Sequence, residues 1–313
     1  MRSSAAALLA VASAAGLLIG ACEAQTGGAR RTVLFVCRRS DHGYGEHEYA
    51  AAGRRIARHL EEALRSVRVA VCEDGWPGDR SLVEHVSAVV VGSDAGRLVK
   101  EHGEELERLA AKGAGLAFLH YTLDPGTAES CERMMRLVGG VYEQHWSVNP
   151  YWEARFDTLP DHPITRGVRP FSLEDEWYYH LRFVPDMKGV TPILEPIPPE
   201  FTRMYPFGPH TGNPAVRARK GMREVVAWAY ERPDGGRGFG LTGLHTYWTL
   251  ADDSLRTLLL NAVVWVAGAE VPAGGVPSRR PTLEELMADI GRPAPEDFDA
   301  EAARIRIERM NRP

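Results

Sequence analysis

Apolar and polar positions alternate along residues 32–140 in a pattern that predicts strands and helices in turn. Continuous apolar runs rich in β-branched side chains are typical of strands buried on both faces of a parallel sheet. Between these runs, apolar residues recur at helical spacing with charged residues on the opposite side, which indicates amphipathic helices. The predicted strands are Thr32–Cys37, Val67–Val71, Ser87–Val91 and Gly115–His120, and the predicted helices are Tyr49–Leu64, Leu98–Ala111 and Cys131–Val138.

This alternation predicts an α/β fold with a doubly wound, mostly parallel sheet and helices on both of its faces. In such sheets, ligands bind in the crevice beyond the carboxyl ends of the strands. Four segments follow those ends, namely residues 38–48, 73–79, 92–96 and 120–126. We therefore expect the chemistry of the protein in these loops.

The pattern changes after residue 150. Residues 152–157 alternate like a half-exposed strand, and residues 225–230 and 239–243 predict a hairpin around a Pro-Asp-Gly-Gly turn. Between them lies a proline-rich stretch, residues 185–214, which predicts a long irregular excursion.

The C-terminal part of the chain predicts helices. Asp252 is expected to cap a helix that runs through Ala267 and ends at a glycine. Beyond it, residues 271–313 form a charged tail with short helices that we expect to pack loosely. Residues 32–270 are therefore predicted to form one elaborated domain, followed by this tail.

The N-terminus differs from the rest of the chain. Residues Ala5 to Ala21 are small or apolar apart from one serine, and a single cation, Arg2, precedes them, which is typical of an export signal. The run ends in Leu-Ile-Gly-Ala-Cys22, which resembles a bacterial lipobox, where the cysteine thiol is acylated.

We therefore predict a signal peptide of the lipoprotein type over residues 1–21 and a linker over residues 22–31. The protein would then be exported to the periplasm or cell envelope and held at the membrane by lipid on Cys22. The alternative is ordinary cleavage after Ala21 or Ala24, which would release a secreted protein.

Composition and cysteine spacing narrow the class further. The 313 residues are 44% hydrophobic and 25% charged, which are values typical of a globular protein. A net charge of −5 without a basic stripe argues against nucleic-acid binding. Cys37, Cys72 and Cys131 form no CxxC pair, which excludes a zinc ribbon or a redox motif. We expect inert thiols, with one disulfide at most.

Several segments are informative when they are taken in order. They are residues 33–60 with His42, Glu46 and His47, then Lys112–His120, His162–Gly167, Asp175–Tyr179, and Gly236–His245 leading into residues 258–268. Together they resemble the ThuA-like (trehalose utilisation) family, which has the flavodoxin-like fold of class I glutamine amidotransferases. The resemblance covers about residues 32–270.

The resemblance implies carbohydrate chemistry. Members of the family are associated with disaccharide catabolism and with 3-keto sugars that partner dehydrogenases make, and many members are exported. Amidotransferases of this fold carry a nucleophilic cysteine at the turn after the strand that corresponds to residues 115–119. This chain has His120 and Tyr121 there, and its nearest cysteine, Cys131, falls on the following helix. Without a thiolate at this turn, cysteine-dependent glutaminase chemistry is excluded.

Histidine and carboxylate side chains gather in the first of the predicted loops. Asp41, His42, Glu46 and His47 could bind a divalent ion or perform acid-base chemistry on a sugar. The alternative is that Glu46 and His47 cap the following helix. His120 closes a buried strand at the carboxyl edge of the sheet, where a doubly wound fold places its site.

Two later segments add further candidates. On a strand, Glu176, Tyr178 and His180 would share one face by period-two alternation. His245 ends a glycine-rich apolar run, and Trp248 after it offers a flat face that could stack on a sugar ring.

These observations assign roles to individual residues. The predicted catalytic residues are His42, His47, His120, Glu176 and His245. The predicted substrate-binding residues are Asp41, Glu46, Tyr121, His145, Tyr178 and Trp248. Three other histidines, His59, His85 and His102, are expected to face solvent without a role.

The sequence thus predicts an exported ThuA-like enzyme, a hydrolase, lyase or isomerase, that acts on a (3-keto) glycoside or disaccharide by histidine and glutamate acid-base chemistry. The alternative is a non-catalytic, lipid-anchored carbohydrate-binding protein. Since no phosphate-cradling loop is evident, neither flavin nor nicotinamide is expected. The predicted catalytic residues also offer enough nitrogen and oxygen ligands for a divalent ion, but no compact motif such as HExxH supports one, so the metal stays open.

Overall fold

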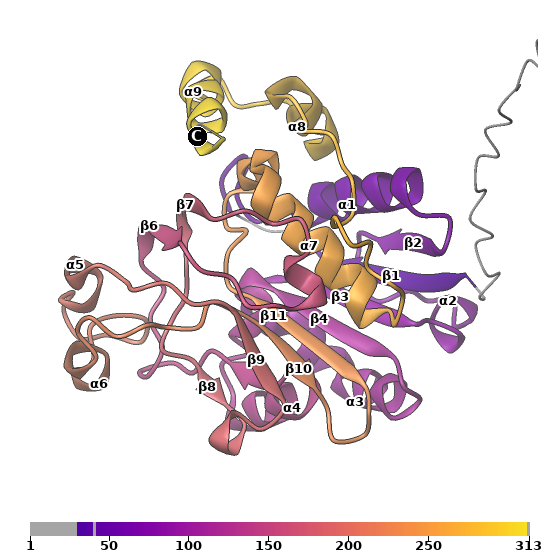
Figure 1. The fold of residues 1–313 in the computed structure, drawn as a ribbon, viewed down its shortest axis with the longest axis horizontal. Coiled ribbons are helices and arrows are strands. Elements are labelled where there is room, and N and C mark those ends of the chain that lie inside the picture. Colours follow the sequence, from indigo (N-terminus) through magenta and orange to yellow (C-terminus); the bar gives the residue numbers. More distant parts are fainter. Residues whose placement is uncertain (1–29, 40–41, 312–313) are drawn as a thin grey trace, which may run out of the picture.

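The computed structural model describes residues 30–39 and 42–311, and its centre is a seven-stranded sheet (Figure 1). The first five strands in spatial order run parallel, and the sixth is antiparallel to both of its neighbours. In spatial order the strands are β2 (Val67–Cys72), β1 (Arg31–Cys37), β3 (Ala88–Gly92), β4 (Gly115–Leu119), β11 (Arg237–Leu241), β10 (Ala227–Glu231) and β9 (Val190–Leu194).

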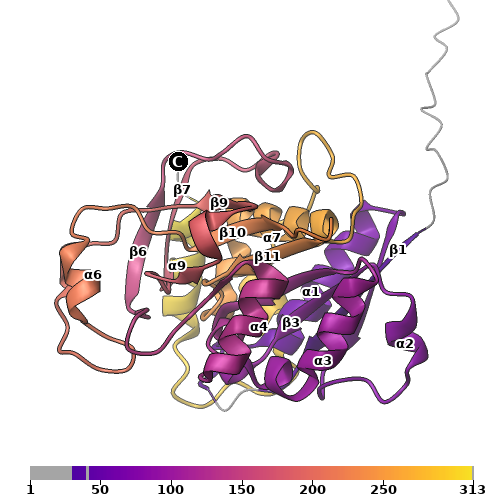
Figure 2. The same ribbon diagram turned by 90° about the horizontal axis from the view of Figure 1, so that it is seen from below.

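Helices cover both faces of this sheet, as Figures 1 and 2 show. Alternate residues of β1 separate into two cores, with Val33 and Phe35 on one side and Leu34 and Val36 on the other. The doubly wound, mostly parallel α/β fold predicted from the sequence is therefore confirmed. On the first face lie α1 (Tyr49–Ala63) and α7 (Asp253–Val266), and on the second lie α2 (Ser81–Glu84), α3 (Arg97–Ala111) and α4 (Ala128–Val138).

Local sequence sets the ends of two of these helices. The side chain of Thr127 accepts a hydrogen bond from the Ser130 amide at the start of α4, and Asp252 accepts one from the Leu255 amide at the start of α7. α4 stops at Gly139, whose φ of +81° suits a residue without Cβ. The predicted cap at Asp252 is thus confirmed.

The region between β4 and β10 carries two small sheets as well as the proline-rich excursion. The prediction of an irregular excursion is wrong in part, because it contains strand β9 and two short helices. Pro192 is tolerated in β9 because this strand lies at the edge of the sheet. At an edge, a residue without an N–H does not remove a hydrogen bond between strands. The elements here are β5 (Gly140–Val141) paired with β8 (Arg182–Phe183), β6 (Tyr151–Phe156) paired with β7 (Phe171–Glu176), and helices α5 (Glu200–Arg203) and α6 (Pro214–Ala218).

The C-terminal tail packs on α1, and the expectation of a loose tail is wrong. Its helices are α8 (Leu283–Ile290) and α9 (Ala300–Met310), whose buried apolar residues join the main core. Asp289 is buried and accepts hydrogen bonds from Arg55 at 2.6 Å and from Arg58 at 3.2 Å. This cover also buries His59 on α1, which was expected to face solvent.

In the described part of the chain, no helix is both long and apolar enough to cross a membrane.

Candidate functional site

Loops after three parallel strands bring three histidines to one point at the carboxyl edge of the sheet. His47 lies in the loop after β1, His120 directly follows β4, and His245 lies in the loop after β11. Glu176, at the end of β7, completes the group. We call these four residues the histidine cluster. All four were predicted as catalytic from the sequence, and the structure brings them together.

The inward atoms of the histidine cluster all lie within 4.8 Å of one another. Nε2 of His47 lies 3.0 Å from Nε2 of His120 and 2.9 Å from Nδ1 of His245. Oε2 of Glu176 lies 3.4 Å from Nε2 of His120 and 3.2 Å from Nδ1 of His245. Four ligands around a tetrahedral zinc ion lie about 3.3 Å from one another, since each is about 2.0 to 2.1 Å from the metal. The cluster therefore fits a zinc-sized divalent ion.

The outward nitrogens of two cluster histidines show where their hydrogens lie. Nδ1 of His47 is 2.6 Å from a carboxylate oxygen of Asp94, and Nδ1 of His120 is 2.6 Å from the carbonyl oxygen of Thr242. Both oxygens only accept, so each Nδ1 carries a hydrogen, and in the neutral form of each ring the inward Nε2 presents a lone pair. Two lone pairs at 3.0 Å repel each other unless a proton or a metal ion lies between them. Outward bonds of this kind also orient the histidine ligands of metal sites.

The histidine cluster lies on strained backbone that neighbouring residues stabilise. His47 and His120 have φ of +48° and +50°, and Leu244, next to His245, has φ of +80°. Such conformations cost about 1 to 3 kcal/mol each and persist only where the surroundings enforce them. Asp175 supplies part of that enforcement, since its buried carboxylate accepts hydrogen bonds from the Leu244 and Thr246 amides at 2.7 and 3.1 Å.

Three further residues form the rim of the histidine cluster. The exposed ring of His42 stacks on His47 with centroids 3.7 Å apart, and half-buried Tyr121 lies 6.2 Å from His42. Glu46 places a carboxylate oxygen 3.7 Å from Nε2 of His245. These three predicted residues thus meet at the cluster, and they are accessible to a ligand. The alternative that Glu46 and His47 cap α1 is not observed, because Glu48 holds that position without a side-chain bond.

Hydrogen-bond partners complete the inner side of the cluster. The predicted Tyr178 places its hydroxyl 3.3 Å from Nε2 of His120. Asn149 donates to Glu176 at 3.1 Å, and sequence reasoning missed this residue as well as Asp94. The position of Asp94, in the loop after β3 at the carboxyl edge, was the available signal. Asn149 lies outside the loops that the strand order predicts, so the sequence offered no comparable signal for it.

The electrostatics of the cluster keep His47 neutral and Glu176 ionised. Burial lowers the pKa of His47 to about 4, against the opposite effect of Asp94. Burial alone would raise the pKa of Glu176, but hydrogen bonds with His120 and His245 hold it well below its usual range. Burial opposes charge on His245 too, but the Glu176 carboxylate outweighs it and raises the pKa of His245.

Two of the predicted aromatic and histidine positions point elsewhere. β7 ends at Glu176, so His180 does not share a strand face with it and instead stacks on Trp146 with centroids 4.3 Å apart. Trp248 is buried against Gly45, where an added Cβ would come within 2.4 Å of its ring. Trp248 therefore supports the loop that carries His47 and does not face a ligand.

The remaining predictions separate into those away from the cluster and those outside the described residues. His145 is exposed and lies 5.9 Å from the ring of Phe207. It is therefore not part of the histidine cluster. Asp41, Cys22 and the predicted signal peptide, residues 1–21, lie outside the described residues.

The described cysteines are free thiols that burial keeps protonated. Burial raises the pKa of Cys37 to about 12 and that of Cys131 to about 11. His120 occupies the turn after β4, and Cys131 lies on α4 with its sulfur 3.8 Å from the carbonyl oxygen of Tyr142. No described cysteine therefore has the activated thiolate that glutaminase chemistry needs.

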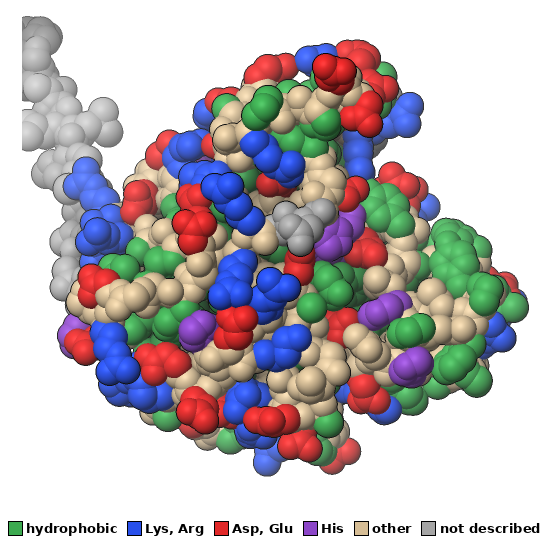
Figure 3. Space-filling model, turned by 180° about the vertical axis from the view of Figure 1, so that it is seen from behind, with side chains coloured by type: hydrophobic (Ala, Val, Ile, Leu, Met, Phe, Trp, Pro, Cys, Tyr) green, Lys and Arg blue, Asp and Glu red, His purple; other side chains and the backbone are tan. Residues whose placement is uncertain are grey.

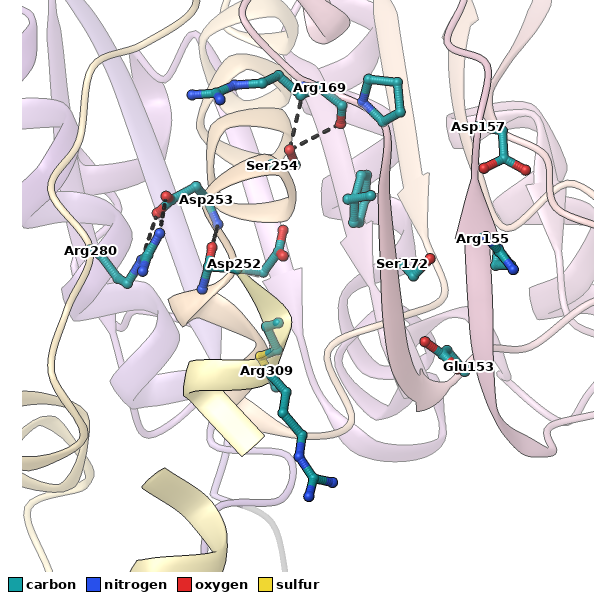
Figure 4. A pocket seen from close by; sticks show the side chains of 14 residues that line it. Glu153, Arg155, Asp157, Arg169, Ser172, Asp252, Asp253, Ser254, Arg280 and Arg309 are labelled. Carbon is teal, nitrogen blue, oxygen red and sulfur yellow. Dashed lines mark hydrogen bonds and ion pairs between the residues drawn. The ribbon is translucent and has the colours of Figure 1, made fainter. Parts of the chain in front are cut away.

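A broad groove of about 690 Å³ lies between the β6–β7 hairpin, the start of α7 and the end of α9 (Figure 4). Its charges are mixed, and Arg280 is already paired with Asp253. Because opposite charges neutralise one another along its walls, the groove offers no counterpart to the converging donor atoms of the cluster. Its charged lining residues are Glu153, Arg155, Asp157, Arg169, Asp252, Asp253, Arg280 and Arg309.

An exposed apolar surface lies on the excursion that holds α5 and α6, at the right of Figure 3. This surface adjoins the segment that leads to the cluster, because the amides of His145 and Asn149 donate to the carbonyls of Pro209 and His210. It exposes aromatic side chains that could stack on a sugar ring, which is the role that the sequence pattern predicted for Trp248. Its residues are Ile197, Phe201, Met204, Tyr205, Phe207 and Met222.

Comparisons with known proteins agree with this fold. The family model ThuA, described as trehalose utilisation, matches residues 32–266. A ThuA-like protein from Bacteroides uniformis shares the fold with a TM-score of 0.54 and 16% identity, over 82% of this chain and 98% of that one. A ThuA-like protein from Parabacteroides merdae gives a TM-score of 0.50 and 13% identity, over 78% and 92%. No curated protein matches the sequence. The chain belongs to the ThuA family.

Proposed function

We propose that this protein is an exported, metal-dependent enzyme of carbohydrate catabolism. The observation that carries the proposal is the convergence of three imidazole nitrogens and one carboxylate oxygen within 4.8 Å of one another, with four of the contacts between them at 2.9 to 3.4 Å. When His47 and His120 are neutral, their Nε2 atoms face each other with lone pairs, because their outward partners are acceptors. A divalent ion of the size of zinc satisfies this arrangement.

The residues around the proposed metal centre have different roles. A bound divalent ion would act as a Lewis acid on a sugar carbonyl or lower the pKa of a water molecule. Asp94 and the carbonyl of Thr242 hold the rings of His47 and His120 in the required orientation. His42, exposed at the rim and 3.3 Å from Asp94, is placed to take and return a proton at the substrate.

The substrate side supports a sugar ligand. Sugar rings present hydroxyl groups at their edges and apolar faces that stack on aromatic side chains. Tyr121 and Glu46 at the rim can bind hydroxyl groups, and the apolar surface with Tyr205 and Phe207 offers aromatic faces nearby. We propose a (3-keto) glycoside or disaccharide as the substrate. An oxidised sugar of this kind would be supplied by a sugar dehydrogenase, and neither nucleic acid nor a nicotinamide is part of the proposal.

Export and membrane attachment are proposed from the sequence of residues 1–22. The apolar run and the Leu-Ile-Gly-Ala-Cys22 ending support acylation at Cys22. Mass spectrometry of the mature N-terminus tests this. Diacylglyceryl mass on Cys22 supports a lipid anchor, whereas a free N-terminus at Cys22 or Gln25 indicates ordinary secretion.

Turnover in the presence and absence of metal tests the catalytic proposal. The purified protein is stripped with EDTA, reloaded with Zn²⁺, Mn²⁺ or Co²⁺, and incubated with 3-keto and unmodified disaccharides, and the products are identified by NMR. We expect turnover only after reloading and a preference for the oxidised sugar. His120→Ala and His245→Ala should abolish turnover.

Two outcomes separate this proposal from its competitors. Exposed His85 on the loop after α2 provides the matched control, and His85→Ala should keep full activity. Binding of a sugar without any turnover would instead favour a lipid-anchored carbohydrate-binding protein. Full turnover by the EDTA-treated protein would contradict the metal requirement.

A further inference from the structure

The C-terminal tail reaches the loops that carry the histidine cluster. The family model ends at residue 266, so the tail lies outside the matched region. After α8, the chain crosses residues 42–48, which we call the first ligand loop, and then enters α9. Residues 243–248, which carry His245, are called the second ligand loop.

Phe298 of the tail packs between the two ligand loops. Its ring lies 4.9 Å from that of Tyr44 in the first ligand loop and 5.6 Å from that of Trp248 in the second. Trp248 in turn fills the space beside Gly45, and the absence of a Cβ at Gly45 makes this close approach possible. The three aromatic rings therefore form one packed unit that spans both loops.

Arg292 adds a charged contact to the first ligand loop. Its guanidinium pairs with the carboxylate of Glu48 and lies 5.3 Å above the ring of Tyr44. The same Glu48 oxygen accepts a hydrogen bond from the Gly45 amide at 3.1 Å. Arg292 thus closes the first ligand loop from outside, one residue beyond His47.

The two ligand loops are joined to each other by backbone hydrogen bonds. The His47 amide donates to the carbonyl of His245 at 2.8 Å, and the Tyr247 amide donates to the carbonyl of Gly45 at the same distance. A displacement of either loop would therefore move both histidines. The tail has a firm anchor of its own, since Asp289 binds Arg55 and accepts from the Tyr247 hydroxyl at 3.1 Å.

We propose that the tail is a brace in which Arg292 and Phe298 position His47 and His245 for metal binding. The inference rests on the proposed metal centre and adds to it residues that touch neither metal nor substrate. The strained φ of His47 supports it, because such a backbone needs outside support, and the tail contacts the loop that carries it. Arg292 and Phe298 are therefore positioning residues.

Metal affinity of the whole protein tests the brace. Co²⁺ absorption and competition with a zinc chelator are measured for the wild type, Phe298→Ala and Arg292→Ala. We expect about 10- to 100-fold weaker affinity and an altered Co²⁺ spectrum in both variants, the range seen when partners that orient metal ligands are removed. Phe298→Tyr keeps the ring and should restore wild-type affinity.

A variant that destabilises the protein elsewhere controls for indirect effects. Leu106 is fully buried on α3, on the other face of the sheet, and Leu106→Ala should lower the thermal midpoint at least as much as Phe298→Ala does. Its folded molecules should keep wild-type metal affinity. Equal loss of affinity in Leu106→Ala and Phe298→Ala, or unchanged affinity in Phe298→Ala, would overturn the brace.

A measurement without metal distinguishes failure of the brace from failure of the proposed function. Side-chain ¹H–¹⁵N NMR signals of His47 and His245 are recorded in EDTA. Phe298→Ala should shift both signals while Leu106→Ala leaves them in place, even if the wild type bound no metal. A wild type without metal affinity would contradict the proposed function, and unmoved histidine signals in Phe298→Ala would contradict the brace.

Discussion

The histidine cluster and the contact between the tail and α1 are both buried and polar, but they are built in opposite ways. At the tail contact, donors meet an acceptor, because Asp289 accepts from Arg55, Arg58 and the Tyr247 hydroxyl. In the histidine cluster, inward nitrogens of His47 and His120 meet each other at 3.0 Å.

The difference shows how a structural network can be told from a binding site. A network that only stabilises the fold pairs most of its buried donors with acceptors, since each unpaired buried polar group destabilises the protein. In a binding site, by contrast, several electron-donating atoms point at one position, and a bound ligand there interacts with all of them. Four predictions test this difference between the two regions, in order from the largest expected effect to the smallest.

Breaking the tail contact should cost stability. Arg55→Met removes the main partner of Asp289 and leaves a buried carboxylate short of a donor, so the free energy of unfolding should fall by about 3 to 5 kcal/mol. Urea denaturation at pH 7 in EDTA measures this. Arg68→Met, at an exposed position of β2, serves as the control and should stay within about 0.5 kcal/mol of wild type.

Breaking the histidine cluster should cost metal affinity and little stability. His245→Ala removes one of four ligands, and we expect zinc affinity to fall about 10³-fold, or about 4 kcal/mol. In EDTA, the free energy of unfolding should fall by less than in Arg55→Met, because the main contact that the ring of His245 loses is the one with the Glu176 carboxylate. A large loss of stability without a change in affinity would reverse the contrast between the two regions.

Acid should weaken the tail contact through His59. This imidazole is buried, neither of its nitrogens has a hydrogen-bond partner, and burial together with Arg256, Arg55, Arg279 and Arg58 lowers its pKa from 6.5 to about 4.

The folded state therefore resists protonation of His59, and the unfolded chain binds more protons at acidic pH. The free energy of unfolding should fall as pH drops from about 6.5 to 4, with up to about 3 kcal/mol from this residue. Denaturation of wild type and His59→Leu across this range isolates the contribution. Parallel pH profiles for the two proteins would rule it out.

Changing a partner of the histidine cluster should have a smaller effect than removing a ligand. Asp94→Asn keeps the shape of the group that binds Nδ1 of His47 but removes its charge. We expect zinc affinity to fall about 10- to 100-fold, or about 1.4 to 2.8 kcal/mol. Chelator competition measures the change, and Asp157→Asn on the loop after β6 should leave affinity at the wild-type value.

Much of the fold could be predicted because buried parallel strands leave a clear trace. β1, β3 and β4 are short runs of apolar residues followed by polar loops, and these loops carry His47, Asp94 and His120. The excursion and the tail were predicted less well. Their boundaries depend on packing partners that lie far away in the chain, such as α1 for the tail.

The candidate site could be predicted as a set of residues but not as an arrangement. His47, His120, Glu176 and His245 were singled out because each lies at the end of a strand or beside one. Trp248 was misassigned as a sugar platform, because sequence pattern does not show which aromatic side chains another loop covers.

The sequence by itself determined the doubly wound sheet and the loops in which chemistry could occur, because apolar periodicity depends on neighbours a few residues away. Only the tertiary structure decided that four ligand atoms from His47, His120, Glu176 and His245 meet within 4.8 Å of one another. These residues lie up to 198 positions apart in the chain. Their meeting depends on strand order, strained loop backbones and the packing that holds them, none of which any local stretch of sequence encodes.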